Sequence, residues 1–334
     1  MNMKQWVSDI IHSPVKKPLP ILSFPCVQLC GVTVRDLVND SILQVKGMKM
    51  VADRVSSAAS VSLMDLSVEA EAFGSAIHMN DNEVPTVTGA IICDEDEADS
   101  LEIPAVGTAR TGVYVEAVRM ATDLIHDRPV FAGMIGPFSL AGRLMDVTEI
   151  MYLCYDEPEM VHTVLGKVTD FLIEYAKAYK DAGANGVIIA EPLAGLLSPT
   201  LAAEFSHSYM KKIVGSVQTD EFAVIYHNCG NTVSMMKQDI YDIGAMGYHF
   251  GNAVKMTDML SDVPDDVLIM GNISPADLFL GGTSQKTRAA TLHLMQECCI
   301  KPNFVISSGC DIPPKSSWEN IDAFFAAVNE FYTE

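Results

Sequence analysis

A short apolar run followed by a longer amphipathic stretch recurs along this chain of 334 residues. This repeat constrains the fold most, because parallel strands buried on both faces are continuously apolar and each needs a crossover helix. The eight runs are residues 19–25, 61–67, 128–137, 186–192, 222–230, 246–252, 266–274 and 303–313. They predict an α/β protein built as a single (β/α)8 TIM barrel. A doubly wound open sheet would give a similar pattern, but no G-x-G-x-x-G motif follows the first run.

Two segments lie outside the repeat. An N-terminal extension precedes the first run, and residues 80–112, after the second run, are acidic and rich in loop-forming residues. In a barrel, the loops after the strands cover the carboxyl-terminal face, where barrel enzymes place their active sites. We therefore expect one barrel domain over residues 1–334, with residues 80–112 as an insertion over that face. The acidic cluster at residues 94–99 is either a solvated loop or helix start, or a cation site.

Charge and hydropathy exclude several classes of function. The chain has 43 acidic and 22 basic residues, a net charge of −21, which disfavours nucleic acid as a partner. A small anionic substrate stays compatible, because a local arginine or lysine can bind it. The sequence has neither a membrane-spanning apolar stretch nor a signal peptide, so we expect no membrane contact and a cytoplasmic location. Its eight cysteines are then expected to be thiols.

Polar side chains interrupt several predicted strands at their carboxyl ends, at Glu191, His227, Cys229, His249, Asn272 and Cys310. All these ends meet at one rim of a parallel barrel. His227 and Cys229 are two residues apart, so strand alternation points both side chains to the same side. Cys310 approaches the same rim from the last strand. The alternative is a core histidine that is hydrogen-bonded to backbone beside a buried cysteine.

One imidazole and two thiolates favour Zn²⁺ over Mg²⁺ or Ca²⁺. Three protein ligands leave a fourth position for water or substrate, as in catalytic zinc sites. Glu191 is the nearest acidic candidate for that position, or for a group that supports a ligand. Two negative thiolates weaken the metal as an activator of water. The set therefore favours alkyl transfer to a zinc-bound sulfur over hydrolysis.

A more specific resemblance rests on six motifs. They are MDLSVEAEAFG (64–74), GPFSLAGRLM (136–145), IIAEPLAGLLSP (188–199), YHNCGNT (226–232), GNISP (271–275) and SSGCDIPP (307–314). The chain resembles the uroporphyrinogen decarboxylase superfamily, in its branch of zinc-containing methylcobamide:coenzyme M methyltransferases. The zinc pattern of that branch, H-x-C and a distant downstream C, matches His227, Cys229 and Cys310.

The resemblance implies a (β/α)8 barrel that moves a methyl group from a methylated corrinoid (methylcobamide), carried by a partner corrinoid protein, to a small thiol such as coenzyme M. The candidates for binding the sulfonate of coenzyme M are Arg143, Asn272 and Asn228. For Arg143 the alternative is an arginine at the start of a helix that pairs with a surface acid. His249 would be a base or would support a zinc ligand, or it is a hydrogen-bonded residue at a strand end. Asp65 and Glu69 would contact the corrinoid or order their loop, and helix capping is the alternative.

Two other functions fit the same fold. The first is decarboxylation of a tetrapyrrole such as uroporphyrinogen. Decarboxylases of this superfamily resemble one another in an N-terminal arginine-rich segment that binds the substrate carboxylates, whereas Arg35 is the only arginine before Arg54 here. The second is a corrinoid-binding barrel without turnover. The methyl acceptor (coenzyme M, another thiol or a folate), the original methyl donor and the oligomeric state stay open.

Overall fold

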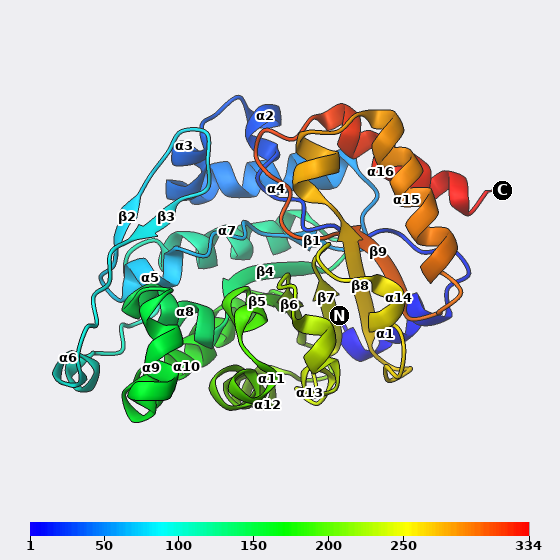
Figure 1. Cartoon of the computed structure of the whole chain (residues 1–334). Helices are drawn as coiled ribbons and strands as arrows, with labels where there is room; N and C mark the ends of the chain where they lie inside the picture. The colour runs from blue at the N-terminus through cyan, green and yellow to red at the C-terminus, as the bar shows by residue number, and fades with distance from the viewer. Residues whose placement is uncertain (334) are drawn as a thin grey trace.

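Seven parallel strands form the central sheet of the computed structural model, which describes residues 1–333 (Figure 1). They are β1 (Ser60–Val61), β4 (Val130–Ile135), β5 (Gly186–Ala190), β6 (Ala223–Asn228), β7 (Gly247–Phe250), β8 (Leu268–Ile273) and β9 (Phe304–Ser308). The strands are neighbours in this order, and every pair is parallel. The sheet curls and its strands alternate with helices, which confirms the predicted α/β barrel class.

The first predicted strand is not formed, and an irregular segment takes its place. The Leu19 amide donates to the Ile306 carbonyl of β9 at 3.0 Å, and the Ala58 amide donates to the Pro18 carbonyl at 2.8 Å. The segment therefore lies between β9 and the chain leading into β1, where an eighth strand would close the barrel. Three prolines within residues 18–25 explain its irregular form, because proline has no amide proton to donate to a ladder.

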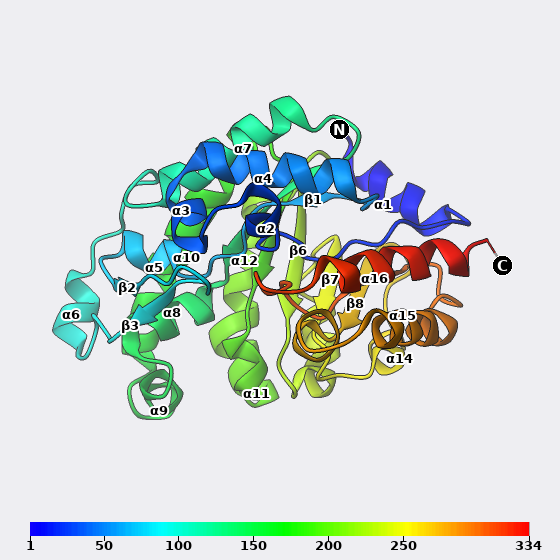
Figure 2. The same ribbon diagram turned by 90° about the horizontal axis from the view of Figure 1, so that it is seen from above.

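Long helices cover the outer face of the sheet, as the two views show together (Figures 1 and 2). They are α4 (Ser41–Arg54), α7 (Thr111–Leu124), α10 (Pro158–Asp181), α12 (Ser208–Val217), α15 (Ser284–Cys298) and α16 (Trp318–Phe331). Helix α10 buries Val161, Leu165, Val168 and Leu172, which are three or four residues apart and share one face. These faces and the outward side chains of the strands form the larger hydrophobic core.

Helix α1 (Met3–His12) closes the amino-terminal end of the barrel. Its buried residues Met3, Val7 and Ile11 are four apart and form one stripe. They join a second core, made of inward-facing strand side chains such as Phe131. The Met3 amide donates to the carbonyl of Asp220, just before β6, at 2.6 Å. The barrel interior is therefore filled at this end, and the carboxyl end is left for a site.

The remaining helical segments are short. Before β4 they are α2 (Cys26–Cys30), α3 (Val34–Asn39), α5 (Val68–Ala72) and α6 (Glu95–Ser100). After β4 they are α8 (Pro137–Met145), α9 (Glu149–Asp156), η1 (Leu193–Leu196), α11 (Pro199–Ala202), η2 (Ala203–His207), η3 (Val233–Met236), α13 (Lys237–Tyr241), α14 (Met256–Met259) and η4 (Pro275–Leu280). Within residues 1–333, no helix combines the length and the apolar character needed to cross a membrane.

The segment at residues 80–112 is fastened to α8 and α10 by backbone carbonyls. It contains β3 (Thr86–Thr88), paired in an antiparallel hairpin with β2 (Ala76–His78), and α6. The Ile92 amide donates to the Leu144 carbonyl at 3.1 Å, and Lys167 Nζ donates to the Asp99 carbonyl at 2.6 Å. The acidic cluster starts α6, and Asp94 caps that helix by accepting from the Glu97 amide.

Candidate metal centre

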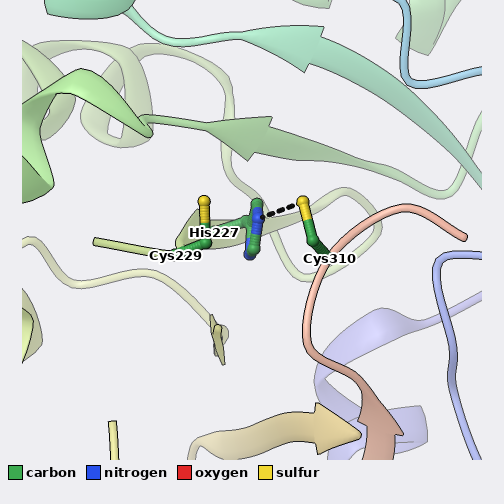
Figure 3. A group of neighbouring side chains, drawn as sticks. All are labelled: His227, Cys229 and Cys310. Carbon is green, nitrogen blue, oxygen red and sulfur yellow. Dashed lines mark hydrogen bonds between the residues drawn. The ribbon is translucent and has the colours of Figure 1, made fainter. Parts of the chain in front are cut away.

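Three soft ligands from two strand ends meet at the carboxyl end of the barrel (Figure 3). His227 is the second-to-last residue of β6, Cys229 directly follows that strand, and Cys310 lies in the loop after β9. One ligand atom from each of the three lies within 4.8 Å of the others, and His227 Nε2 is 3.4 Å from Cys310 Sγ. Ligand atoms in a tetrahedral zinc site are about 3.5–3.8 Å apart, given Zn–S of about 2.3 Å and Zn–N of about 2.0–2.1 Å. The donors and their spacing therefore fit zinc.

The thiols of Cys229 and Cys310 shift each other's pKa in opposite directions. The hydrogen bond with Cys310 lowers the pKa of the Cys229 thiol, and the same bond raises the pKa of Cys310 well above its ordinary value. The thiolate is the form of cysteine that binds metals and attacks carbon. Cys229 is therefore the more acidic thiol of the pair.

His249 supports the ring of His227 from the next strand. The two Nδ1 atoms are 2.8 Å apart, and His227 Nδ1 is also 3.2 Å from the carbonyl oxygen of His249. On its other side, His249 Nε2 is 2.7 Å from Ser307 Oγ of β9. Burial lowers the pKa of His249 well below its ordinary value, so this imidazole is neutral. Of its two predicted roles, contact with a candidate ligand is the one that this position supports.

Glu191 directly follows β5, the strand beside the cluster, but its side chain faces away from the cluster. Ala190 of β5 and His227 of β6 are register partners that point inward, so the residue after Ala190 turns toward the helices. There the Glu191 carboxylate accepts from the Ser139 amide at 3.1 Å and the Ser206 hydroxyl at 2.7 Å. Burial raises the pKa of Glu191 to about 7. Within residues 1–333, the cluster of ligand atoms does not include this carboxylate, which corrects its expected place as a fourth ligand.

The amide groups of the two predicted asparagines already have protein partners. Asn228 faces away from the cluster, and its Nδ2 donates to the Tyr226 hydroxyl at 2.9 Å. Asn272 Nδ2 donates to the carbonyls of Gly251 and Val254 at 2.9 and 2.8 Å. These bonds fix the loops around the cluster, and they use both amide protons of Asn272 but only one of Asn228, so the expected donation to a ligand stays a prediction.

Asp65 is the centre of a buried network that orders the loop before α5. Its carboxylate forms an ion pair with Arg110 and accepts from the Tyr114 hydroxyl at 2.8 Å. The other oxygen accepts from the Ser67 amide at 3.0 Å, in a local turn. Of the predicted roles of Asp65, these contacts support the ordering of the loop. The sequence pattern did not reveal Arg110, because 45 residues separate it from Asp65.

Glu69 and Arg143 lie near each other, and each has an unmatched polar atom. Glu69 Oε1 accepts from the Ile135 amide at 3.0 Å, and burial raises the pKa of this carboxyl to about 7. Among the described residues, Glu69 Oε2 and Arg143 Nε have no hydrogen-bond partner. Burial lowers the pKa of Arg143, and the nearby Glu69 and Asp65 act in the opposite direction. A buried N–H without a hydrogen-bond partner lowers the stability of the fold. An anionic ligand that accepts from Arg143 Nε would supply the missing bond.

Comparisons with known proteins place this barrel in a family. A family model described as uroporphyrinogen decarboxylase (URO-D) matches residues 25–331. The methylcobamide:CoM methyltransferase MtaA of Methanosarcina barkeri is 28% identical, over 80% of this chain and 78% of that protein. A uroporphyrinogen decarboxylase of Myxococcus xanthus is also 28% identical, over 75% and 72%. The solved structure of a methyltransferase from Methanosarcina mazei has a TM-score of 0.87 at 26% identity, over 99% and 98% of the two chains. The chain therefore belongs to the uroporphyrinogen decarboxylase family of enzymes.

Proposed function

We propose that this enzyme is a zinc-dependent methyltransferase that moves a methyl group from a methylated corrinoid to a small thiol such as coenzyme M. The observation that carries the proposal is the cluster of His227, Cys229 and Cys310, whose soft donors leave one position for a ligand. The methylcobamide:CoM methyltransferases among its relatives support the same reaction. We further propose that a partner corrinoid protein presents the methylcobamide.

Bound zinc would supply a Lewis acid that keeps the acceptor thiol deprotonated at neutral pH. The acceptor sulfur attacks the methyl carbon while the carbon–cobalt bond breaks. The electron pair of that bond leaves with the cobalt, so the products are a thioether and a Co(I) corrinoid. The contribution of the chain is orientation, because β6 and the loop after β9 fix the three ligands in one place.

Arg143 is the proposed anchor for the anionic end of the acceptor. Its Nε–H is buried and has no partner among the described residues, and the nearby Glu69 carboxyl has a pKa raised to about 7. Glu69 is therefore only partly ionised at neutral pH and neutralises Arg143 incompletely. A sulfonate would complete the hydrogen bonding of the guanidinium with a charge-assisted bond.

Metal analysis joined to a methyl-transfer assay tests the proposal. The purified protein should contain about one zinc ion per chain. Free methylcobalamin should lose its methyl group, followed by absorbance, when coenzyme M is added, and a panel of other thiols defines the acceptor. Cys229→Ser and Cys310→Ser should lose the zinc and at least about 100-fold of the rate. Cys93→Ser, at an exposed cysteine, is the matched control and should keep both.

Two outcomes would contradict the proposal. One is a folded wild-type protein without zinc; the other is a Cys310→Ser variant with an unchanged rate. Decarboxylation of uroporphyrinogen is the second candidate function, favoured by the relative from Myxococcus xanthus. Consumption of uroporphyrinogen without any demethylation of methylcobalamin would select it.

A further inference from the structure

Behind the candidate metal centre, a line of hydrogen bonds runs from His227 to the irregular segment that replaces the first strand. His227 Nδ1 is 2.8 Å from His249 Nδ1, and His249 Nε2 is 2.7 Å from Ser307 Oγ. Ser307 Oγ is in turn 2.7 Å from the carbonyl oxygen of Leu19. All three polar side chains are buried. Water therefore does not compete for these bonds, and each proton on the line has to be assigned to one of the two atoms that flank it.

One arrangement of protons satisfies the whole line. The Leu19 carbonyl can only accept, so the single hydroxyl proton of Ser307 is donated to it. Ser307 Oγ then accepts from His249, which places the proton of that imidazole on Nε2. With one proton on each ring, His249 Nδ1 keeps a lone pair, and the carbonyl oxygen of His249, which can only accept, lies 3.2 Å from His227 Nδ1 and requires a proton there. That lone pair accepts the Nδ1–H of His227, which leaves His227 Nε2 without a proton.

The unprotonated nitrogen is the one that faces the cluster, 3.4 Å from Cys310 Sγ. A neutral histidine binds a metal through its lone pair, and the hydrogen bond at its other nitrogen selects the tautomer. We infer that Ser307, His249 and the Leu19 carbonyl are positioning groups that lock His227 in its Nδ1–H tautomer and so prepare Nε2 to bind a metal ion. The identity of that ion as zinc rests on the proposed function, but the tautomer does not.

The irregular segment at residues 18–25 has a role in this arrangement of protons, because it supplies the Leu19 carbonyl. In a regular parallel ladder, the carbonyl of a strand residue accepts from a backbone amide of the neighbouring strand. Here the Leu19 amide is tied to the Ile306 carbonyl at 3.0 Å, and the Ile21 amide donates to Ser308 Oγ at 3.0 Å. These two bonds hold the segment against β9, while the Leu19 carbonyl accepts from the Ser307 side chain. The segment thus supplies the fixed acceptor that orders the whole line.

The first experiment measures the tautomer directly. The full-length protein is labelled with ¹⁵N-histidine, stripped of metal with a chelator and studied by long-range ¹H–¹⁵N correlation NMR, with His227→Gln and His249→Gln for assignment. The expected result is a proton on Nδ1 of His227 and on Nε2 of His249. A proton on Nε2 of His227 in the wild-type protein overturns the inference, and no other variant is needed for that decision.

The second experiment measures zinc affinity by competition with a chromophoric chelator. Ser307→Ala should raise the dissociation constant about 10- to 100-fold, as the loss of a group that orients a ligand does elsewhere. Ser307→Thr keeps the hydroxyl and should restore most of the affinity. Ser308→Ala is the matched control, because Ser308 holds the same segment through the Ile21 amide, and it should bind zinc within about 3-fold of the wild type.

Equal weakening by Ser307→Ala and Ser308→Ala would overturn the inference, because the position of the segment would then matter and the proton line would not. Wild-type affinity and tautomer in Ser307→Ala would overturn it too. If Ser307→Ala does not fold, the tautomer of the wild-type protein decides. A protein with the expected tautomer and zinc but no methyl transfer would contradict only the proposed function, so the two can fail separately.

Discussion

At the scale of single residues, one step along a strand decides whether a side chain faces the cluster. At the end of β6, His227 and Cys229 point inward and Asn228, between them, hydrogen-bonds outward to Tyr226. At the end of β5 the same alternation separates the inward Ala190 from Glu191. Because successive side chains of a strand alternate between its two faces, neighbours in sequence belong to different environments. Whether a polar residue can join the cluster therefore depends on which face of the strand its position puts it on, as well as on its residue type.

Arg143 gives a prediction at this scale. Arg143→Ala should raise KM for coenzyme M about 10- to 100-fold, because a hydrogen bond to a charged group contributes about 1.5–3 kcal/mol. KM for the uncharged thiol 2-mercaptoethanol should change much less, since it has no anionic end to bind. Arg119→Ala, at an exposed arginine paired with Glu116, is the control. Parallel losses with both thiols would show that Arg143 supports the structure and does not recognise the sulfonate.

Glu69 gives a prediction about pH. Burial raises the pKa of this carboxyl from 4.5 to about 7, so the folded protein binds a proton that the unfolded chain releases near pH 4.5. Its contribution to stability is complete below about pH 4.5 and is lost as the pH rises through about 7. Glu69→Gln mimics the protonated form and should be about 1–3 kcal/mol more stable than the wild type at pH 8, with little difference at pH 5.

Urea unfolding of wild type and Glu69→Gln at pH 5, 6.5 and 8 measures that difference. Glu83→Gln, at an exposed acid, is the control and should follow the wild type at each pH. Glu191, whose pKa is also raised to about 7, keeps part of the pH dependence in all three proteins. A Glu69→Gln variant that is less stable than the wild type at pH 8 would mean that its ionised carboxylate stabilises the fold.

At the scale of elements, the loop with η1 after β5 packs directly on the loop that carries Cys229. A Cβ added to Gly195 would lie 2.5 Å from Gly230 Cα, and Thr232 Oγ1 donates to the Gly195 carbonyl at 2.7 Å. Gly195→Ala should therefore displace both loops, cost about 1–3 kcal/mol of stability and weaken zinc binding. Gly166→Ala, in open space on α10, should instead stabilise the protein by up to about 1 kcal/mol. Equal effects of the two substitutions on unfolding and on zinc titration would refute the packing argument.

The elements that could be predicted are those with a strong local signal. Seven of the eight apolar runs contribute strands to the sheet, because continuous burial on both faces leaves a readable apolar pattern, although only Val61 of the run at 61–67 lies in a strand. The prediction of a strand at the first run was wrong, since its prolines lack the backbone N–H donors that a strand ladder needs. The direction in which the Glu191 side chain points could not be predicted without the register of β5 against its neighbours. Arg110 and Ser307 were missed because their partners lie 45 and 288 residues away, and no local pattern marks such pairs.

At the scale of the whole molecule, the barrel is filled at its amino-terminal end and carries the candidate centre at the opposite, carboxyl-terminal end. Helix α1 fills the amino end of the barrel, and the candidate centre lies at the carboxyl end. The chain around them carries a net charge of −21, so the proposed anionic acceptor would approach against the electric field of the protein. In the proposed function, the buried guanidinium of Arg143, whose Nε has no partner among the described residues, would offset that field locally.

The same net charge predicts how salt changes the stability of the fold. Like charges on a compact surface repel one another, and salt screens that repulsion over about 10 Å at 0.1 M. The Tm should therefore rise by about 2–4 °C between roughly 0.05 and 0.5 M NaCl, as measured by calorimetry. A variant that removes four exposed charges, whose side chains have no hydrogen bond within residues 1–333, tests the cause: Glu83→Gln, Glu95→Gln, Asp96→Asn and Glu102→Gln. It should be more stable than the wild type at low salt and respond less to added salt. If both proteins gained the same number of degrees, the salt would be acting on hydration and not on the repulsion between the acidic residues.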